Sequence, residues 1–151
     1  MSKVKITFAG GAKTPTGSNF LIEFGDKKFL VDCGLYQGPK LSTPSNREDF
    51  SYAPGQIDAL FVTHGHLDHV GRIPKLVRDG FAGPIYSTPP TRDIGELIMF
   101  DSMSILNKES ERENLPPLYE EGDILKAMQG WHVQDYHEVL PIHTSLGIVT
   151  V

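Results

Sequence analysis

The sequence is poor in three features, and each absence limits what the protein can be. It has one cysteine among 151 residues, so no disulfide can form within the chain. Its apolar runs are far too short to span a bilayer, and its first residues lack the apolar core of a signal peptide. Its net charge is −5, and no basic stripe typical of nucleic-acid binders is evident. We therefore expect a cytoplasmic globular domain without membrane contacts, and not an autonomous nucleic-acid-binding module.

The stretch 58–71 contains the motif that points to chemistry. An apolar run ending at Val62 predicts a short buried strand. We expect a loop to follow it, with a sharp turn at Gly65, and then a helix over 70–79. Imidazole and carboxylate groups suit zinc and similar metals. A lone histidine is more often structural, but three histidines and an aspartate in this register are rare by chance, so we predict metal binding. The predicted ligands are His64, His66, Asp68 and His69.

Asp32 and Cys33 follow a β-hairpin predicted over 18–24 and 28–31. Asp32 could be a turn residue that accepts hydrogen bonds from its own backbone. It could instead hold a metal-binding histidine in one tautomer from behind, a role that metal sites commonly require. The histidine motif favours the second interpretation. Cys33 ends an apolar run, which indicates a small buried thiol rather than a ligand.

The remaining apolar patterns predict further strands and helices. The helix over 91–107 carries an apolar stripe that we expect to face the core. The stripe consists of Ile94, Leu97, Ile98, Met103 or Ser102, and Ile105, and Met99 and Phe100 widen it. The chain stops inside an apolar, β-branched run, so we expect it to be part of a larger protein. The other predicted elements are strands over 4–9, 84–87, 131–140 and 147–151, a helical turn over 46–50 and a helix over 123–128.

The His-x-His-x-Asp-His pattern at 64–69 resembles the signature of the metallo-β-lactamase superfamily. A narrower resemblance, to the β-CASP RNA-processing nucleases, rests on segments 10–12, 15–19 and 31–38 and on the long helical stretch after Pro89. The resemblance covers essentially the whole chain. It implies an α/β (α+β) fold, the N-terminal portion of an αββα sandwich. Residues 1–151 would form that portion, and the later ligand motifs and the β-CASP domain would be absent from it.

This resemblance also implies a site with two zinc ions at one edge of the sandwich. His64 and His66 would bind one ion, and Asp68 and His69 the other. Asp32 would support the ligands from behind. The superfamily's later ligand histidine sits in a Gly-His context that the other histidines lack. Those unassigned residues are His132, His137 and His143.

The implied activity is hydrolysis of RNA, or of another single-stranded nucleic acid, by a hydroxide that two zinc ions activate. Asp68 would be both a ligand and the catalytic carboxylate that orients or deprotonates the attacking water. A zinc site typically needs about three protein ligands and an open water position. Because this chain offers two per ion, we expect it to be a poor nuclease, or none, when isolated.

Two other functions stay open at this point. A different hydrolase of the superfamily could act on thioesters, lactones or lactams, although such enzymes usually bring their next ligand histidine sooner. A truncated, non-catalytic scaffold would fit the missing ligands but not the intact motif. A homo-oligomer could also complete the site if a second copy supplied strands or ligands at the end 147–151.

Overall fold

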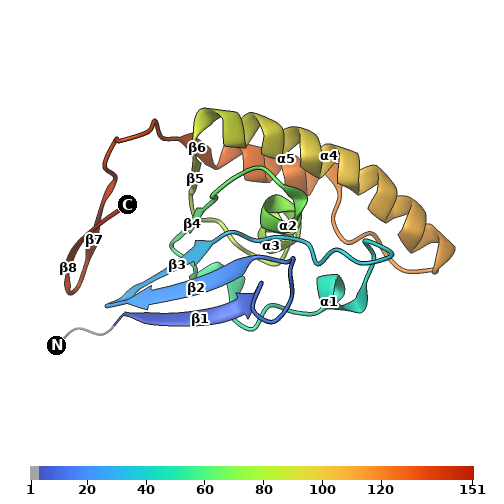
Figure 1. Cartoon of the computed structure of the whole chain (residues 1–151), viewed down its shortest axis with the longest axis horizontal. Helices are drawn as coiled ribbons and strands as arrows, with labels where there is room; N and C mark the ends of the chain where they lie inside the picture. The colour runs from blue at the N-terminus through green and yellow to red at the C-terminus, as the bar shows by residue number, and fades with distance from the viewer. Residues whose placement is uncertain (1–3) are drawn as a thin grey trace.

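The computed structural model describes residues 4–151 (Figure 1). Its centre is a six-stranded sheet in which spatial order follows chain order, from β1 to β6. The pairs β1–β2 and β2–β3 are antiparallel, whereas β3 to β6 run parallel. The strands are β1 (Lys5–Gly10), β2 (Asn19–Phe24), β3 (Lys27–Val31), β4 (Ala59–Phe61), β5 (Ile85–Ser87) and β6 (Trp131–Val133).

Parallel neighbours require crossover connections, and these contain the helices. Helices α2 and α3 lie between β4 and β5, and α4 and α5 lie between β5 and β6. A separate hairpin, β7 (Pro141–Thr144) with β8 (Gly147–Thr150), extends from the end of the chain (Figure 1). Within residues 4–151, no helix combines the length and apolarity needed to cross a membrane. The helices are α1 (Pro44–Arg47), the 3-10 turn η1 (Pro54–Gln56), α2 (Leu67–Val70), α3 (Ile73–Arg78), α4 (Pro89–Arg112) and α5 (Glu121–Gln129).

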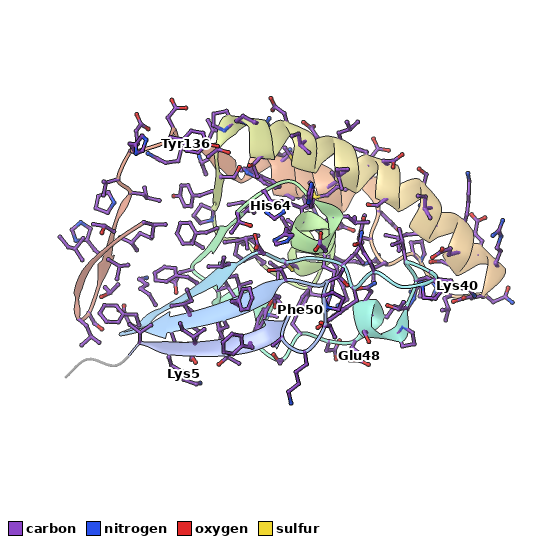
Figure 2. The ribbon with its side chains drawn as sticks, viewed as in Figure 1. Lys5, Lys40, Glu48, Phe50, His64 and Tyr136 are labelled. Atoms are coloured by element: carbon purple, nitrogen blue, oxygen red, sulfur yellow. The ribbon has the colours of Figure 1, made fainter. Side chains whose placement is uncertain are left out.

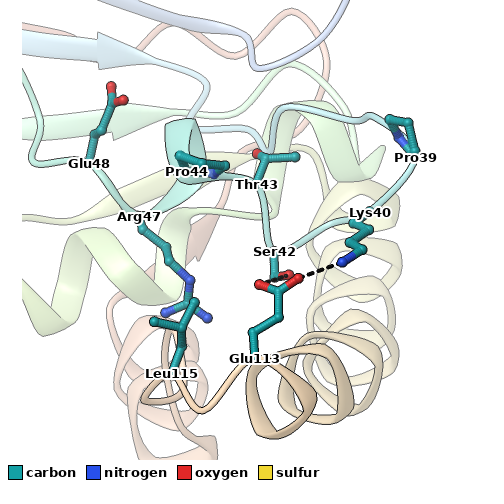
Figure 3. Close-up of a pocket in the computed structure, with 9 residues that line it drawn as sticks. All are labelled: Pro39, Lys40, Ser42, Thr43, Pro44, Arg47, Glu48, Glu113 and Leu115. Atoms are coloured by element: carbon teal, nitrogen blue, oxygen red, sulfur yellow. Dashed lines mark hydrogen bonds and ion pairs between the residues drawn. The ribbon is translucent and has the colours of Figure 1, made fainter.

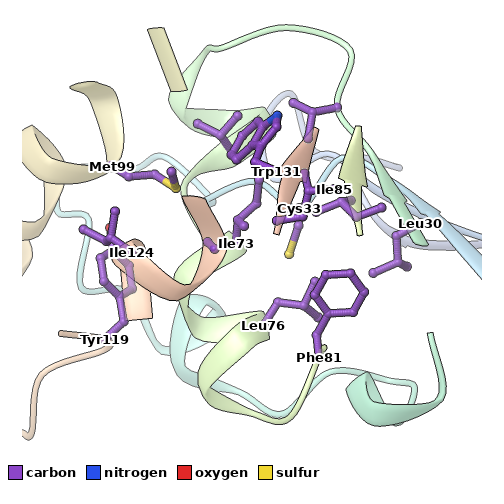
Figure 4. Packing of buried hydrophobic residues seen from close by; sticks show 14 of the residues in the cluster. Leu30, Cys33, Ile73, Leu76, Phe81, Ile85, Met99, Tyr119, Ile124 and Trp131 are labelled. Carbon is purple, nitrogen blue, oxygen red and sulfur yellow. The ribbon is translucent and has the colours of Figure 1, made fainter. Parts of the chain in front are cut away.

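The core lies between one face of this sheet and the helices (Figure 4). A single row of paired residues crosses five strands on that face, and every member is buried. Burying one such side chain contributes roughly 1.5–3 kcal/mol, so the row fixes the strand register strongly. Its members are Leu21, Leu30, Leu60, Ile85 and Trp131.

The opposite face of the sheet is aromatic and more open. Phe8 packs edge-on against Phe20, and its side chain is 65% exposed. Phe61 and Tyr86 stack with ring centroids 5.7 Å apart, and Tyr86 lies 5.6 Å from the His132 ring. The described chain is therefore one helix-covered sheet with a second apolar face, and it confirms the predicted α/β class.

The predicted strand pattern at the N-terminus is confirmed, with the 18–31 hairpin turning at Gly25 and Asp26. The helix predicted over 70–79 is wrong in its boundaries. Two short helices, α2 and α3, replace it, because Arg72 takes a non-helical conformation between them. The short turn predicted over 46–50 begins earlier, at Pro44, and the strand predicted over 131–140 ends at Val133.

The predicted core face of α4 is wrong in part. Met99 and Ser102 are buried, and Ile98, Phe100 and Met103 pack against the core as predicted. Ile94, Leu97 and Ile105 are 44–69% exposed in the structure. Small side chains on the adjacent face let the helix approach closely, so that a Cβ added at Gly95 would lie 3.2 Å from Trp131 Cη2. Close packing at this contact requires small side chains on α4 more than it requires apolar ones. The buried positions are Thr91, Gly95, Met99, Ser102, Leu106 and Ser110.

Candidate metal centre

Two parallel strands bring the predicted site residues to one edge of the sheet. Val31 at the end of β3 pairs with Phe61 at the end of β4. Asp32 follows β3 directly, and the histidine motif begins three residues after β4. The loops after adjacent parallel strands meet at the same edge, where open α/β sheets commonly bind ligands.

The sequence predicted the whole motif on a loop, but part of it lies in a short helix. Asp68 and His69 lie in the single turn of α2, and His66 is its N-cap. Backbone hydrogen bonds fasten this turn to the chain that follows β3, with Cys33 N donating to His69 O at 2.8 Å and Leu35 N donating to Leu67 O at 3.1 Å. The single turn of α2 is therefore held in place by main-chain hydrogen bonds and not by belonging to a long helix.

Gly34 makes this close approach possible. A Cβ added to it would lie 1.6 Å from Asp68 O, which is far inside contact distance. Ser18 N donates to the same Asp68 oxygen at 2.8 Å, while Gly34 N donates to Ser18 O at 2.9 Å. Three separate segments thus meet at the backbone of Asp68.

Asp32 is buried, and its carboxylate accepts hydrogen bonds from every side. Ser18 Oγ donates at 3.1 Å, and Thr63 donates through its backbone N at 2.9 Å. The Thr63 hydroxyl lies 3.0 Å from both carboxylate oxygens, and His69 Nδ1 lies 2.7 Å from Oδ2. A buried carboxylate needs such partners, so these contacts hold the Asp32 side chain in place. Its φ of 60° is left-handed, a conformation that aspartate tolerates better than most residues.

These contacts assign the ring tautomers of two histidines. A carboxylate can only accept, so His69 Nδ1 donates to Asp32, and in the neutral ring Nε2 then keeps its lone pair. The Thr63 hydroxyl donates to Asp32, so it accepts from His64 Nδ1, which lies 3.0 Å away. In its neutral form each ring therefore presents an unprotonated Nε2, the form in which histidine binds metal.

The structure brings the three motif histidines into one cluster. The His64 ring centroid lies 3.9 Å from that of His69 and 4.7 Å from that of His66. Burial, followed by the nearby His69 and His66, lowers the pKa of His64 below its ordinary value. A neutral imidazole is thereby favoured at neutral pH, as a metal ligand requires.

Asp68 and His69 are placed as a ligand pair would be. Asp68 Oδ2 lies 3.5 Å from His69 Nε2. Two donors on one tetrahedral zinc, each about 2.0–2.1 Å from it, lie roughly 3.3 Å apart. Within residues 4–151, however, no group of three or more His, Cys, Asp or Glu side chains is arranged to hold a metal ion. The donor side chains therefore fit a divalent metal as pairs, with two side chains for one ion.

The other histidines and the sole cysteine lie outside this cluster. Cys33 is completely buried, as predicted, and burial raises the pKa of its thiol to about 12. The remaining histidines, His132, His137 and His143, are exposed.

A large pocket of the described chain lies away from this cluster. Figure 3 shows it between the loop 39–48 and the end of α4, with a volume of about 810 Å³. Lys40 pairs with Glu113 at 2.6 Å in this pocket, and Arg47 donates to Ser110 Oγ. None of the motif residues lines this pocket.

Residues 14–149 match the metallo-beta-lactamase superfamily, a span that contains Asp32 and the whole motif. The chain belongs to the metallo-β-lactamase superfamily. Solved structures agree at the level of fold: a protein of unknown function from Enterococcus faecalis superposes with a TM-score of 0.53 over 99% of this chain and 43% of its own, at 18% identity. The metallo-β-lactamase-like fold predicted from the sequence is thus confirmed.

Two curated members of the superfamily are similar over nearly the whole chain. The transcription termination factor FttA of Methanosarcina mazei is 38% identical over 150 residues, which cover 96% of this chain and 22% of that protein. A ribonuclease of Thermus thermophilus is 34% identical over 137 residues, 91% of this chain and 30% of its own. The chain thus spans less than a third of either relative's length.

Two residues of this metallo-β-lactamase site were missed by sequence reasoning. Thr63 contacts Asp32, His64 and His69 through one hydroxyl, and Ser18 supplies a further donor to Asp32. Their adjacency to the motif and to the glycine-rich loop was the available signal. Only the three-dimensional meeting of the two strand ends shows that both hydroxyls converge on one carboxylate.

Proposed function

We propose that the protein containing this chain is a metal-dependent hydrolase that cuts RNA, and that it belongs to the β-CASP branch of the superfamily. The observation that carries the proposal is the cluster of His64, His66 and His69 beside Asp68, with Asp32 bonded behind it. Similarity to a ribonuclease and to a transcription termination factor supports RNA as the substrate.

The chain's contribution would be ligands, orientation and proton handling. Zinc ions held by His64 with His66 and by Asp68 with His69 would supply an acidified water as nucleophile and neutralise charge on the phosphodiester. Asp68 would orient the attacking water or take its proton. Asp32 would hold His69 in the tautomer that leaves Nε2 free, a positioning role common behind metal ligands.

We also propose that residues 1–151 are the N-terminal part of the catalytic domain and that further ligands come from outside them. Support comes from the pairwise arrangement of the donors and from the small share of each relative that the chain covers. An ion held by two protein ligands is bound more weakly than one held by three or four.

The test is hydrolysis of a single-stranded RNA by the longer protein, with His66→Ala and an exposed control, His143→Ala. His66→Ala should lose at least about a thousandfold in rate, because a metal ligand is removed. His143→Ala should retain full activity, since the residue lies far from the cluster on the hairpin β7–β8. Retained hydrolysis by His66→Ala would exclude the proposed mechanism.

A further inference from the structure

A second polar pocket, separate from the histidine cluster, opens beside the loop that contains α1. Its volume is about 370 Å³, and none of the motif residues lines it. Figure 2 shows two of its residues, Glu48 and Phe50, on the α1 side and apart from His64. Arg72, the residue between α2 and α3, forms part of its wall.

Arg72 is buried and has few partners. It is 6% exposed, and its Nη2 donates to Glu48 O at 3.3 Å. Its Nε is buried without any hydrogen-bond partner. Among residues 4–151, no carboxylate forms an ion pair with it. A guanidinium has five N–H donors, and a buried charge left unpaired costs several kcal/mol.

The Arg72 guanidinium is nevertheless held firmly in position. It lies 4.4 Å from the Phe50 ring centroid and 5.9 Å from that of Tyr36. Its backbone N donates to Cys33 O at 2.9 Å. The neighbouring buried cation, Lys75, also lies over Phe50 but is paired with Asp79. Arg72 is therefore the buried cation of the described chain whose charge is not matched by a carboxylate.

We propose that this pocket binds a small phosphorylated molecule, with its phosphate on Arg72. The fork of N–H groups matches phosphate oxygens, and the hydroxyls of Ser45 and Ser51 line the same pocket. Glu48 and Asp49, both exposed, also line the pocket, and their carboxylates can accept hydrogen bonds from ligand hydroxyls. The ligand class is thus a hydroxylated phosphate, such as a sugar phosphate, and the volume suits a small one.

Calorimetric titration with ribose 5-phosphate, inorganic phosphate and ribose tests this site independently of hydrolysis or metal. Wild-type chain should bind ribose 5-phosphate more tightly than inorganic phosphate, and ribose should not bind at about 10 mM. Arg72→Met, which keeps the stem and removes the charge, should bind at least about tenfold more weakly. Arg92→Met, which removes a partly exposed arginine on α4, should bind like wild type.

A second variant keeps the proposal open to refutation if Arg72→Met does not fold. Ser45→Phe fills the pocket from an exposed position and leaves Arg72 in place. It should also abolish binding of ribose 5-phosphate. Absence of binding by wild type at about 10 mM, or equal affinity in Ser45→Phe and wild type, would overturn the proposal.

Discussion

Replacing Gly34 with alanine should displace α2 and disrupt the candidate metal centre. The new Cβ would lie 1.6 Å from Asp68 O and 2.0 Å from Asp68 C, and both are backbone atoms that cannot rotate away. The two segments would have to separate by about 1.5 Å to reach van der Waals contact. That movement breaks the hydrogen bonds from Ser18 N to Asp68 O and from Cys33 N to His69 O.

The expected cost follows from these two effects. Two lost hydrogen bonds cost about 1 kcal/mol each, and overpacking adds about 1–3 kcal/mol. We expect the free energy of unfolding to fall by about 3–5 kcal/mol, which corresponds to roughly 10 °C in melting temperature for a chain of this size.

The assay is urea and thermal denaturation followed by circular dichroism, with Gly122→Ala as the matched control. A Cβ at Gly122 meets nothing within 4 Å, and its position in α5 favours alanine by about 0.5–1 kcal/mol. Gly122→Ala should therefore match or exceed the stability of wild type. A Gly34→Ala melting temperature within about 2 °C of wild type would refute the reasoning, because it would show that α2 can be displaced from Gly34 without loss of stability.

Two further predictions concern residues beside the motif. Asp32→Asn keeps the left-handed backbone but loses hydrogen-bond acceptors for the groups that donate to Asp32, so the free energy of unfolding measured in urea should fall by about 2 kcal/mol. The exposed control Asp101→Asn should change it by less than about 0.5 kcal/mol. Equal stabilities of the two variants would contradict the role given to the Asp32 carboxylate. Cys33 should not react with Ellman's reagent at pH 8 in the folded chain, because a buried thiol with a pKa of about 12 stays protonated at pH 8. It should react fully in guanidinium. Fast reaction of the native chain would show that the core opens.

The motif itself and the strand leading into it could be predicted because their signals are local. An apolar β-branched run followed by closely spaced ligands requires no knowledge of distant contacts. The sequence also favoured a place for Asp32 behind one of the motif histidines, without indicating which one, since an acid at a strand end beside such a motif has a limited set of roles. The hydrogen bond of 2.7 Å agrees with that prediction.

The elements that escaped prediction depend on tertiary packing. The predicted face of α4 wrongly included Ile94, Leu97 and Ile105, because the close approach of the helix to Trp131 requires Gly95 rather than a bulky side chain. The helix predicted over 70–79 is interrupted at Arg72, where the Arg72 backbone N donates to Cys33 O, 39 positions earlier in the sequence. Hydrophobic periodicity carries no information on either contact.

The most direct test of the metal centre is a zinc titration of this chain, monitored by NMR of the histidine ring nitrogens. All six histidines report at once, so the exposed His132, His137 and His143 serve as internal controls. The account predicts that the ring signals of His64, His66 and His69 shift together, with Nε2 as the binding atom of His64 and His69. Shifts confined to the three exposed histidines, or spread equally over all six, would contradict it.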